Sequence, residues 1–450
     1  MQITNNFNNK FNFLNQNFLI LIIIFLRYGN TYSADLSYIF LIFFAISGRL
    51  QIIQALLLSW FFSMGNWMLM PDSNFALVGR YLIIFACFLS IILRGGLIRV
   101  DRNILYTFFL GIYFIVHSFV FSQISSVSIL KSVNWITVIL TLSMTWYSFT
   151  EQERRYIYKW ITKFLEFIAI FSLPFLFFEA GYQKTGDNFQ GILSHPMVFG
   201  PTMAILGSIY LSQLFNERKL SFFLLFKLSI IFTLVSLSAS RTAFFALSFV
   251  SLCSIIFVII FSKYKISSYL PIFKDIKIIL FALITALLLF LDHQFFHLLE
   301  YIITKSNKVD VSNLMEAYEI SRGRLFESMI QNIRENPFFG IGFGIASDIQ
   351  SMEIVYDPIF NLPIQAPVEK GVMFVAIIEE VGVIGFFLFC LWLKMIISQA
   401  IHNGAIYIFV IMLIFLLNLA EATLFSPGGM GLINLILLSS AVAKIKFEKK

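Results

Sequence analysis

Charged residues are scarce in this chain of 450 residues: Asp, Glu, Lys and Arg make up 13% of it, whereas 59% of the residues are hydrophobic. Soluble domains are typically about 25% charged. A water-soluble fold could not bury so much apolar surface, so the bilayer must act as its solvent. The sequence therefore predicts a protein that crosses a membrane many times.

Cysteine is also scarce, and the usual metal and nucleotide motifs are missing. The three cysteines each stand inside an apolar run, where a thiol acts as a small packing group. There is no P-loop, no His-Glu-x-x-His motif and no Asp-x-Asp pair. His293 and His297 stand four residues apart but lack an obvious third ligand. These absences argue against ATPases, metalloproteases and metal-dependent nucleotide-sugar transferases, and we expect neither a metal site nor a cofactor.

Apolar runs long enough to cross a bilayer recur along the whole chain. About 20 apolar residues span the hydrocarbon core as a helix, because backbone groups in lipid must bond within their own segment. By this measure we expect an all-α fold, a polytopic transmembrane helical bundle of about 12–14 spans. The candidate spans are residues 14–27, 35–48, 51–70, 75–94, 103–122, 128–149, 157–179, 195–214, 220–238, 242–262, 275–291, 371–394, 402–420 and 428–443.

Positive charge is distributed unevenly between the loops. Lys and Arg gather in alternate loops and in the C-terminal tail, and by the positive-inside rule that side is cytoplasmic. Both termini are then cytoplasmic, and the loops at 180–195, 238–242 and 292–370 lie on the other face. Topology therefore explains the net charge of +7, and no nucleic-acid partner is expected.

One polar stretch interrupts the apolar sequence, because residues 292–370 contain 17 of the 57 charged residues. We divide the chain into transmembrane helices over 1–291, a large extracytoplasmic loop over 292–370, and C-terminal helices with a short basic tail over 371–450. The loop should contain a helix that starts near Ser321 and ends before Pro337. Its apolar stripe has helical spacing and consists of Leu325, Phe326, Met329, Ile330 and Ile333.

Arginine is the residue type that offers chemistry on the outer face. Arg241 stands between two apolar runs, and Arg322 and Arg324 stand at the start of the predicted loop helix. A guanidinium donates two parallel hydrogen bonds to phosphate, and a helix N-terminus adds attraction for anions. The three arginines are therefore candidate diphosphate binders. The alternatives are that Arg241 extends to the membrane interface and that the other two form a solvated loop face.

Acids and histidine supply the other candidates. Glu369 is a candidate general base, because it stands where the loop returns to the membrane, beside the cation Lys370. Glu379 and Glu380 stand deeper, where ionisable groups are functional or paired, and a buried arginine is the expected partner. His195, at the start of a span, is either a helix cap or a group that binds substrate.

Four segments, in this order, resemble the O-antigen ligase and O-antigen polymerase superfamily of bacterial membrane glycosyltransferases. They are Ser-His-Pro at 194–196, Ser-x-Ser-Arg at 238–241, Arg324 followed by Asn-Pro-Phe-Phe-Gly-Ile-Gly-Phe-Gly at 336–344, and the return segment 369–385. The resemblance covers residues 190–430 or so. It implies an inverting, metal-independent glycosyltransferase in the bacterial inner membrane, with its active site on the periplasmic face.

The resemblance also implies partners. The donor is a glycan on undecaprenyl diphosphate, bound by Arg241 and Arg324, with Arg322, His195 and Lys370 in the same substrate site. The acceptor is a second glycan or a lipid-linked molecule. A chain-length regulator is a further candidate partner.

The return segment separates two activities within this superfamily. Ligases typically have a His-Asn pair there, where this chain has Val-Glu-Lys-Gly at 368–371. This departure favours a polymerase that joins lipid-linked repeat units, with Glu369 as the base. The first alternative is a ligase that moves finished glycan onto lipid A core or another acceptor. The second is a flippase or other transporter, although the sequence lacks the internal repeat typical of that class.

Overall fold

A computed structural model describes residues 16–95, 101–183, 188–217, 221–261, 270–274, 324–356, 363–368 and 370–442. Most of this part of the chain is α-helical, as the apolar runs predict. Strand β1 (Val355–Tyr356) pairs antiparallel with β2 (Pro363–Gln365). The all-α, multi-pass architecture is therefore confirmed.

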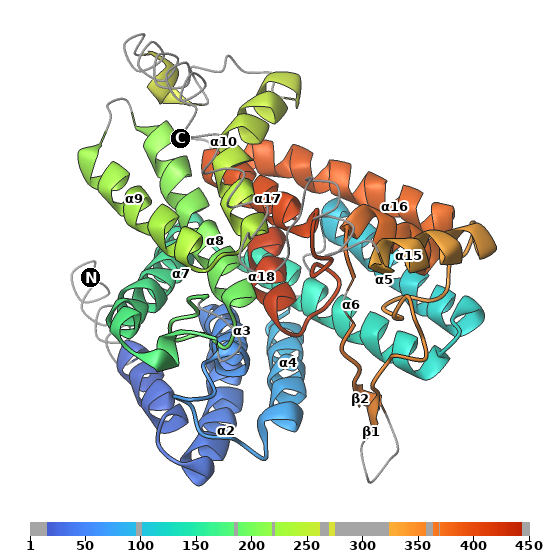
Figure 1. Ribbon diagram of the computed structural model, residues 1–450, viewed down its shortest axis with the longest axis horizontal. Coiled ribbons are helices and arrows are strands. Elements are labelled where there is room, and N and C mark those ends of the chain that lie inside the picture. Colours follow the sequence, from blue (N-terminus) through green and yellow to red (C-terminus); the bar gives the residue numbers. More distant parts are fainter. Residues whose placement is uncertain are drawn as a thin grey trace, which may run out of the picture.

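Figure 1 shows how the helices of the described residues are arranged. A first helix covers Gln16–Arg27. The others are α2 (Thr31–Ser47), α3 (Arg49–Met64), α4 (Ala76–Leu93), α5 (Arg102–Phe121), α6 (Ser125–Ser148), α7 (Glu151–Ser172), α8 (Pro196–Asn216), α9 (Phe222–Leu237), α10 (Arg241–Phe261), α15 (Arg324–Glu335), α16 (Met373–Asn403), α17 (Ala405–Asn418) and α18 (Met430–Val442). Short 3₁₀ segments are η2 (Leu173–Phe177), η3 (Glu179–Gly181) and η4 (Pro271–Lys274).

Seven of the described helices are long and apolar enough to cross a membrane, and six further apolar helices are shorter. The long ones are α4, α5, α6, α7 together with η2, α8, α10 and α16. Each predicted span except one coincides with a described helix. The exception, predicted at 275–291, lies outside the described residues.

Polar residues at helix starts explain several boundaries. The Asn30 side chain accepts from the Ser33 backbone N–H, and the Ser33 hydroxyl accepts from the Asn30 N–H, which is a capping box at the start of α2. Thr150 and Glu153 form the same arrangement at the start of α7. Each box satisfies N–H groups that the first turn of a helix leaves without partners.

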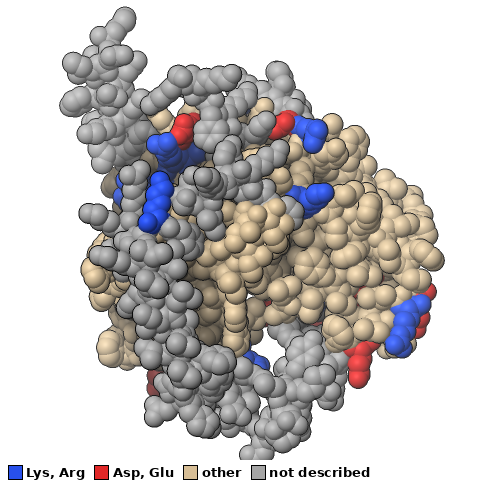
Figure 2. Space-filling view, turned by 90° about the horizontal axis from the view of Figure 1, so that it is seen from above, with Lys and Arg blue, Asp and Glu red and all other residues tan. Residues whose placement is uncertain are grey.

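Side chains on the outside of the bundle are largely apolar. Phe119 on α5 is 74% exposed and Phe226 on α9 is 63% exposed. Figure 2 shows a face on which uncharged atoms predominate among the described residues, with charged side chains in a few separate groups. Exposed apolar surface of this extent is unfavourable in water and fits contact with lipid.

Hydrogen bonds bring the ends of alternate helices together at one end of the bundle. Arg94, which follows α4, donates to the Ile46 carbonyl near the end of α2 at 2.8 Å. Arg49, at the start of α3, donates to the Ser148 carbonyl at the end of α6, also at 2.8 Å. Asn103, in the first turn of α5, donates to the last residue of α18 at 3.2 Å. We call this end the basic side, because Arg49, Arg94 and Arg102 all stand at helix ends that meet here.

The other ends of these helices meet on the opposite side. The Ser194 N–H, before α8, donates to the Met64 carbonyl at the end of α3 at 2.8 Å. The Tyr81 hydroxyl, in the second turn of α4, donates to the Ile364 carbonyl in β2 at 2.9 Å. We call this end the loop side, because the described part of the predicted outer loop lies here. The helices therefore alternate in direction, in agreement with the alternation of basic loops in the sequence.

The helix predicted in the outer loop is α15, which lies beside α16 on the loop side (Figure 1). It ends at Glu335, two residues before Pro337, as the proline predicts. Met329 from the predicted apolar stripe is fully buried. The expected cap, Ser321, lies outside the described residues.

An aromatic cluster packs the glycine-rich segment that follows α15 into the bundle. The Phe343 ring stacks on Phe114 of α5 with centroids 4.6 Å apart, and lies 6.4 Å from Trp135 of α6 and 5.6 Å from Phe425. Such pairs contribute about 0.5–1.5 kcal/mol beyond their buried area. Segments far apart in the sequence are thereby fixed against one another.

Helix α16 is broken at Gly382, which has φ 66° and ψ −176°. The break frees backbone carbonyls just before it. The Glu379 carbonyl accepts from the Ile341 N–H and the Glu380 carbonyl accepts from the Gly342 N–H, both at 2.9 Å. The glycine-rich segment 336–344 and the return segment therefore form one backbone structure.

Replacing Gly382 by Ala should destabilise the protein. Only glycine readily adopts this combination of φ and ψ, and another residue there costs about 1–3 kcal/mol. An added Cβ would also lie 2.0 Å from the Phe338 carbonyl oxygen. Thermal unfolding of the purified protein in detergent should show a lowered midpoint. Gly371→Ala is the control, because a Cβ there meets no atom within 4 Å. Equal midpoints for the two variants would show that the break is not a structural constraint.

Candidate functional site

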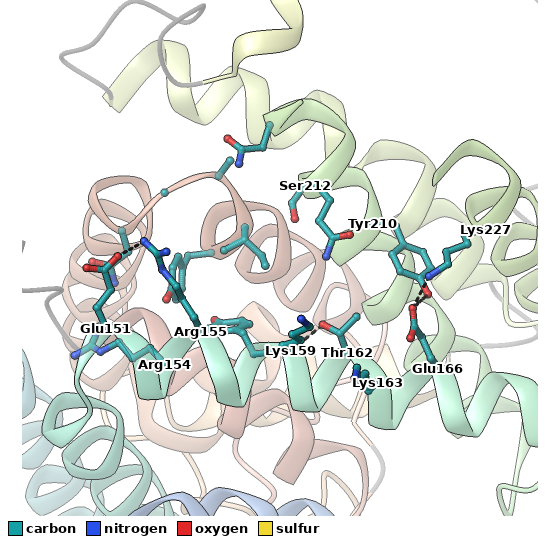
Figure 3. A pocket seen from close by; sticks show the side chains of 18 residues that line it. Glu151, Arg154, Arg155, Lys159, Thr162, Lys163, Glu166, Tyr210, Ser212 and Lys227 are labelled. Carbon is teal, nitrogen blue, oxygen red and sulfur yellow. Dashed lines mark hydrogen bonds and ion pairs between the residues drawn. The ribbon is translucent and has the colours of Figure 1, made fainter. Parts of the chain in front are cut away.

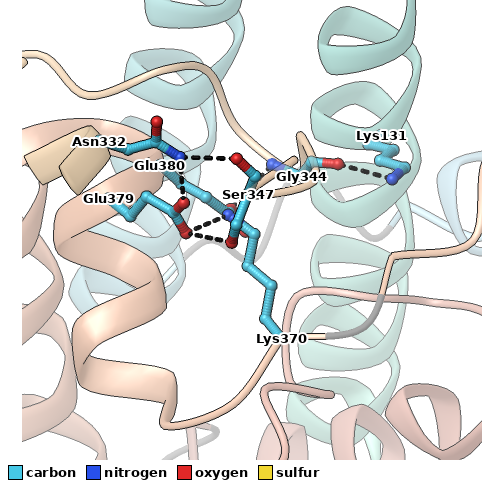
Figure 4. A network of polar contacts seen from close by, with 7 residues as sticks. All are labelled: Lys131, Asn332, Gly344, Ser347, Lys370, Glu379 and Glu380. Atoms are coloured by element: carbon cyan, nitrogen blue, oxygen red, sulfur yellow. Dashed lines mark hydrogen bonds and ion pairs between the residues drawn. The ribbon is translucent and has the colours of Figure 1, made fainter. Parts of the chain in front are cut away.

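Three charged side chains are buried together on the loop side (Figure 4). The Lys370 Nζ lies 2.7 Å from Glu379 Oε2 and 3.3 Å from Glu380 Oε1. The exposed fractions of Lys370, Glu379 and Glu380 are 4%, 0% and 8%. The two acids are therefore paired, as their depth predicts, but the partner is a lysine and not the expected arginine.

Further donors satisfy the two carboxylates. The Asn332 amide on α15 donates to Glu379 Oε1 at 2.7 Å, and the Ser347 hydroxyl donates to Glu379 Oε2 at 3.1 Å. The Gly344 backbone N–H donates to Glu380 Oε2 at 2.8 Å. The network thus joins α15, the glycine-rich segment and α16 to the point where the chain returns to the membrane.

Lys131 on α6 approaches the same network from the other side. Its Nζ donates to the Gly344 carbonyl at 2.6 Å. Gly344 has φ 70°, and a Cβ at this position would lie 2.6 Å from Lys131 Cδ. Glycine is therefore required here by both the backbone conformation and the close approach of the lysine.

A cavity of about 470 Å³ opens beside the network. Its lining includes three cations, Arg80, Lys131 and Lys370, and one carboxylate, Glu380. Helix α18 begins at this cavity, since Met430 is part of the lining. The N-terminus of a helix carries partial positive charge, so the side chains and the helix together favour an anionic ligand.

Small residues bring bare backbone to the same cavity. Pro427, Gly428 and Gly429 line it, and a Cβ at Gly428 would lie 3.0 Å from Arg80 Nη2. Gly429 has a positive φ of 53°. Glycines next to a cation and a helix N-terminus let an anion approach backbone N–H groups closely.

Arg241 begins α10 beside a smaller, neighbouring cavity. The adjacent residues Ser240 and Thr242 line this space of about 20 Å³. Thr423 and Met430 line both the small cavity and the large one. The fold therefore brings the Ser-x-Ser-Arg segment to the loop that borders the cationic cavity.

His195 is the N-cap of α8. Its Nδ1 accepts from the Met197 N–H at 3.1 Å, and its Nε2 lies 3.0 Å from the Gln183 amide nitrogen. Pro196 follows at the first helical position, where its fixed φ suits the helix and its missing N–H is not needed. Of the two interpretations of His195, this geometry is that of a helix cap.

Other predicted residues are not described or are described in part. Arg322 and Glu369 lie outside the described residues, as do His293 and His297. Arg324 is the first residue of α15, and its side chain lies outside the description. Within the described ranges, no group of three His, Cys, Asp or Glu residues is arranged to bind a metal ion.

The sequence patterns did not single out Arg80 and Lys131. Each is a cation in the second turn of an apolar helix, α4 and α6 respectively. An ionisable residue inside a span is a signal of function, so both could have been found. The signal was obscured because cations near span ends also arise from topology alone.

These features define a multi-pass helical membrane protein with a charged site at one end of its bundle. Residues 225–390 match the model of the O-antigen ligase family. This match supports the O-antigen ligase and polymerase superfamily and, with it, glycosyl transfer as the general activity. A comparison with curated proteins finds no match.

The matched region runs from α9 into α16. It includes Arg241, the glycine-rich segment 336–344 and the network of Lys370, Glu379 and Glu380. Arg80, Lys131 and the N-terminus of α18 lie outside it, although the fold brings them to the same cavity. The match supports a glycosyltransferase over a transporter.

Replacing Lys370 by Met should strongly destabilise the protein, because it leaves two adjacent buried carboxylates without their bound ammonium group. Breaking a buried ion pair by removing one partner costs about 3–5 kcal/mol. The double variant K370M/E379Q should recover part of this loss, because only one of the two carboxylates remains. Chemical unfolding in detergent, followed by tryptophan fluorescence, measures the free energies.

The control is Arg155→Met, which removes the partner of Glu151 in an ion pair whose two side chains are 80% and 47% exposed. Exposed pairs contribute about 0–1 kcal/mol, so this variant should remain close to the parent protein. Similar losses for the Lys370 and Arg155 variants would contradict a structural role of the buried network.

Proposed function

We propose that this protein is a polymerase that joins undecaprenyl-diphosphate-linked repeat units of a bacterial surface polysaccharide, an O-antigen or a capsule. The observation that carries the proposal is the loop-side cavity of about 470 Å³, where Arg80, Lys131, Lys370 and the start of α18 converge. A diphosphate needs cations and oriented N–H groups to balance its charge, and this cavity offers both. The family match supports glycosyl transfer as the chemistry.

In the proposed reaction, the acceptor hydroxyl oxygen attacks the anomeric carbon of the donor sugar. The bond between that carbon and the diphosphate oxygen breaks, and undecaprenyl diphosphate leaves with the bonding electrons. Attack from the face opposite to the leaving group inverts the anomeric centre. The hydroxyl proton passes to a general base, for which Glu369 is the candidate.

The cations have a distinct role in this reaction. Negative charge develops on the diphosphate as the glycosidic bond breaks, and Arg80, Lys131 and Arg241 stabilise that charge. Arg322 and Arg324, at the start of the loop helix, are further candidate diphosphate binders. Because cations and backbone groups supply the positive charge, the proposed mechanism requires no metal ion.

The buried network has a positioning role in the proposal. Glu379 and Glu380 fix the Lys370 ammonium at the cavity wall. Val368 and Lys370, the sequence neighbours of Glu369, both line the cavity. This supports the assignment of Glu369 to the reaction at this wall.

The proposed orientation places the basic side in the cytoplasm and the loop side in the periplasm, within the inner membrane. The donor glycan is then on the same face as the cationic cavity. The acceptor is a second lipid-linked glycan, and a chain-length regulator is a further proposed partner.

A ligase is the second candidate function. The observation that favours it is the family match, because the matched model describes O-antigen ligases. The observation against it is the return segment, where Val-Glu-Lys-Gly at 368–371 replaces the His-Asn pair typical of ligases. We therefore place the polymerase first.

Deleting the gene separates the two candidates. Loss of a polymerase leaves single repeat units on the lipid A core and no long chains. Loss of a ligase leaves bare core, with long chains that remain on undecaprenyl diphosphate. Gel analysis of surface polysaccharide, together with analysis of undecaprenyl-linked glycans, distinguishes these patterns. An unchanged pattern of both would contradict either function.

Arg80→Ala and Arg241→Ala should each lower kcat/KM by about 10²–10³-fold, the usual effect of removing one group that stabilises developing charge. The assay uses purified protein and a synthetic undecaprenyl-diphosphate-linked repeat unit, and measures chain growth. Arg102→Ala is the control, because it removes an exposed arginine at the basic side. If all three variants kept the parent rate, the assignment of the cavity to the diphosphate would be wrong.

A further inference from the structure

The protein has a second cavity, of about 720 Å³. Figure 3 shows the side chains that line it. It is lined by the first four turns of α7, the end of α8, Lys227 of α9 and the junction of α16 with α17. Asn403, the last residue of α16, belongs to this lining, whereas the buried glutamates lie near the start of the same helix. The two cavities are therefore at opposite ends of α16.

The lining of this cavity carries excess positive charge. Its charged residues are Arg154, Arg155, Lys159, Lys163 and Lys227, with Glu151 and Glu166. Glu151 pairs with Arg155, and Glu166 pairs with Lys227 at 2.8 Å. Both carboxylates of the lining are thus already bound, while it contains three further cations. An anionic ligand would offset this excess.

The spacing of the cations strengthens this conclusion. Arg155, Lys159 and Lys163 are each four residues apart on α7, so they share one face of the helix. Like charges at this spacing repel and destabilise an isolated helix. The Lys159 and Lys163 side chains are exposed, and both belong to the cavity lining.

The cavity lies next to exposed aromatic side chains on the first turns of α9. Phe222, Phe223 and Phe226 are 82%, 67% and 63% exposed. The Lys227 ammonium lies 4.9 Å from the centroid of the Phe223 ring and 5.1 Å from that of the Tyr210 ring. A cationic cavity next to apolar outer surface is typical of the boundary between lipid headgroups and acyl chains.

We infer that this cavity binds the phosphate-bearing headgroup of an anionic phospholipid, with Lys159 and Lys163 as the principal contacts. The acyl chains of this lipid pack on the exposed phenylalanines of α9. A free phosphate-class anion would satisfy the same cations but would leave those phenylalanines without a partner, so the lipid is the better occupant. This inference does not depend on the proposed polymerase activity, which concerns the other end of the bundle.

Native mass spectrometry of the full-length protein in detergent tests the inference. The protein is titrated with short-chain phosphatidylglycerol, with phosphatidylcholine of the same chain length and with inorganic phosphate. Phosphatidylglycerol should bind more tightly than the other two. In the K159Q/K163Q variant its affinity should fall by about tenfold or more, because each interfacial lysine contributes substantially to attraction of an anionic lipid.

Two matched variants complete the experiment. R102Q/K394Q removes the same number of cations from α5 and the second half of α16, outside the cavity lining, and should bind as the parent protein does. K159R/K163R keeps the charge and should retain binding. Equal effects of K159Q/K163Q and R102Q/K394Q, or equal affinity for the two phospholipids, would overturn the inference. Displacement of phosphatidylglycerol by inorganic phosphate at a similar concentration would overturn the lipid assignment.

Discussion

The break in α16 at Gly382 is the constraint on which the loop-side site depends. In a continuous helix, the Val383 N–H would donate to the Glu379 carbonyl. Here it donates to the Pro337 carbonyl at 3.0 Å, and the Glu379 carbonyl accepts from Ile341 instead. The broken helix and the glycine-rich segment thus exchange backbone hydrogen bonds as two edges of one structure. This exchange brings the glycine-rich segment next to Glu379 and Glu380. The backbone carbonyls of these two residues bind the segment, and their carboxylates bind Lys370.

Burying those charges carries a free-energy cost that the surrounding donors must offset. Desolvation of a single ion costs several kcal/mol even after relaxation. Glu379 receives Lys370, Asn332 and Ser347, and Glu380 receives Lys370 and the Gly344 N–H. An apolar cluster of equal volume would stabilise the fold as well or better, so stability alone does not account for the network. Its specific consequence is geometric, because it fixes a cation and the return segment at the wall of the cavity.

Much of the fold could be predicted from the sequence because its main determinant is local. Apolar runs of span length gave helices, and Pro337 gave the end of α15. The break at Gly382 could not be read in the same way, because glycine is common inside membrane helices and a break requires a partner segment to accept the freed backbone groups. Nor could the approach of Lys131 to the network be predicted, since Lys131 and Gly344 meet across 213 residues of sequence. Contacts of this kind depend on which helices pack together, and neither hydropathy nor charge counts encode that.

The charge of the loop-side cavity bears directly on the proposed reaction. Three cations and one carboxylate in its lining leave two formal positive charges. Glu379, which binds Lys370, lowers this excess to one positive charge. A diphosphate that links lipid to sugar carries one negative charge on each phosphate, so in the proposed reaction these side chains balance the bound donor only in part. As the glycosidic bond breaks, additional negative charge develops on the leaving oxygen, and the attraction of the cations for the diphosphate increases at that point. Interactions that strengthen between ground state and transition state are those that accelerate a reaction. The same attraction opposes the departure of undecaprenyl diphosphate. The Glu380 carboxylate in the lining limits the net positive charge of the cavity and therefore favours release of this product.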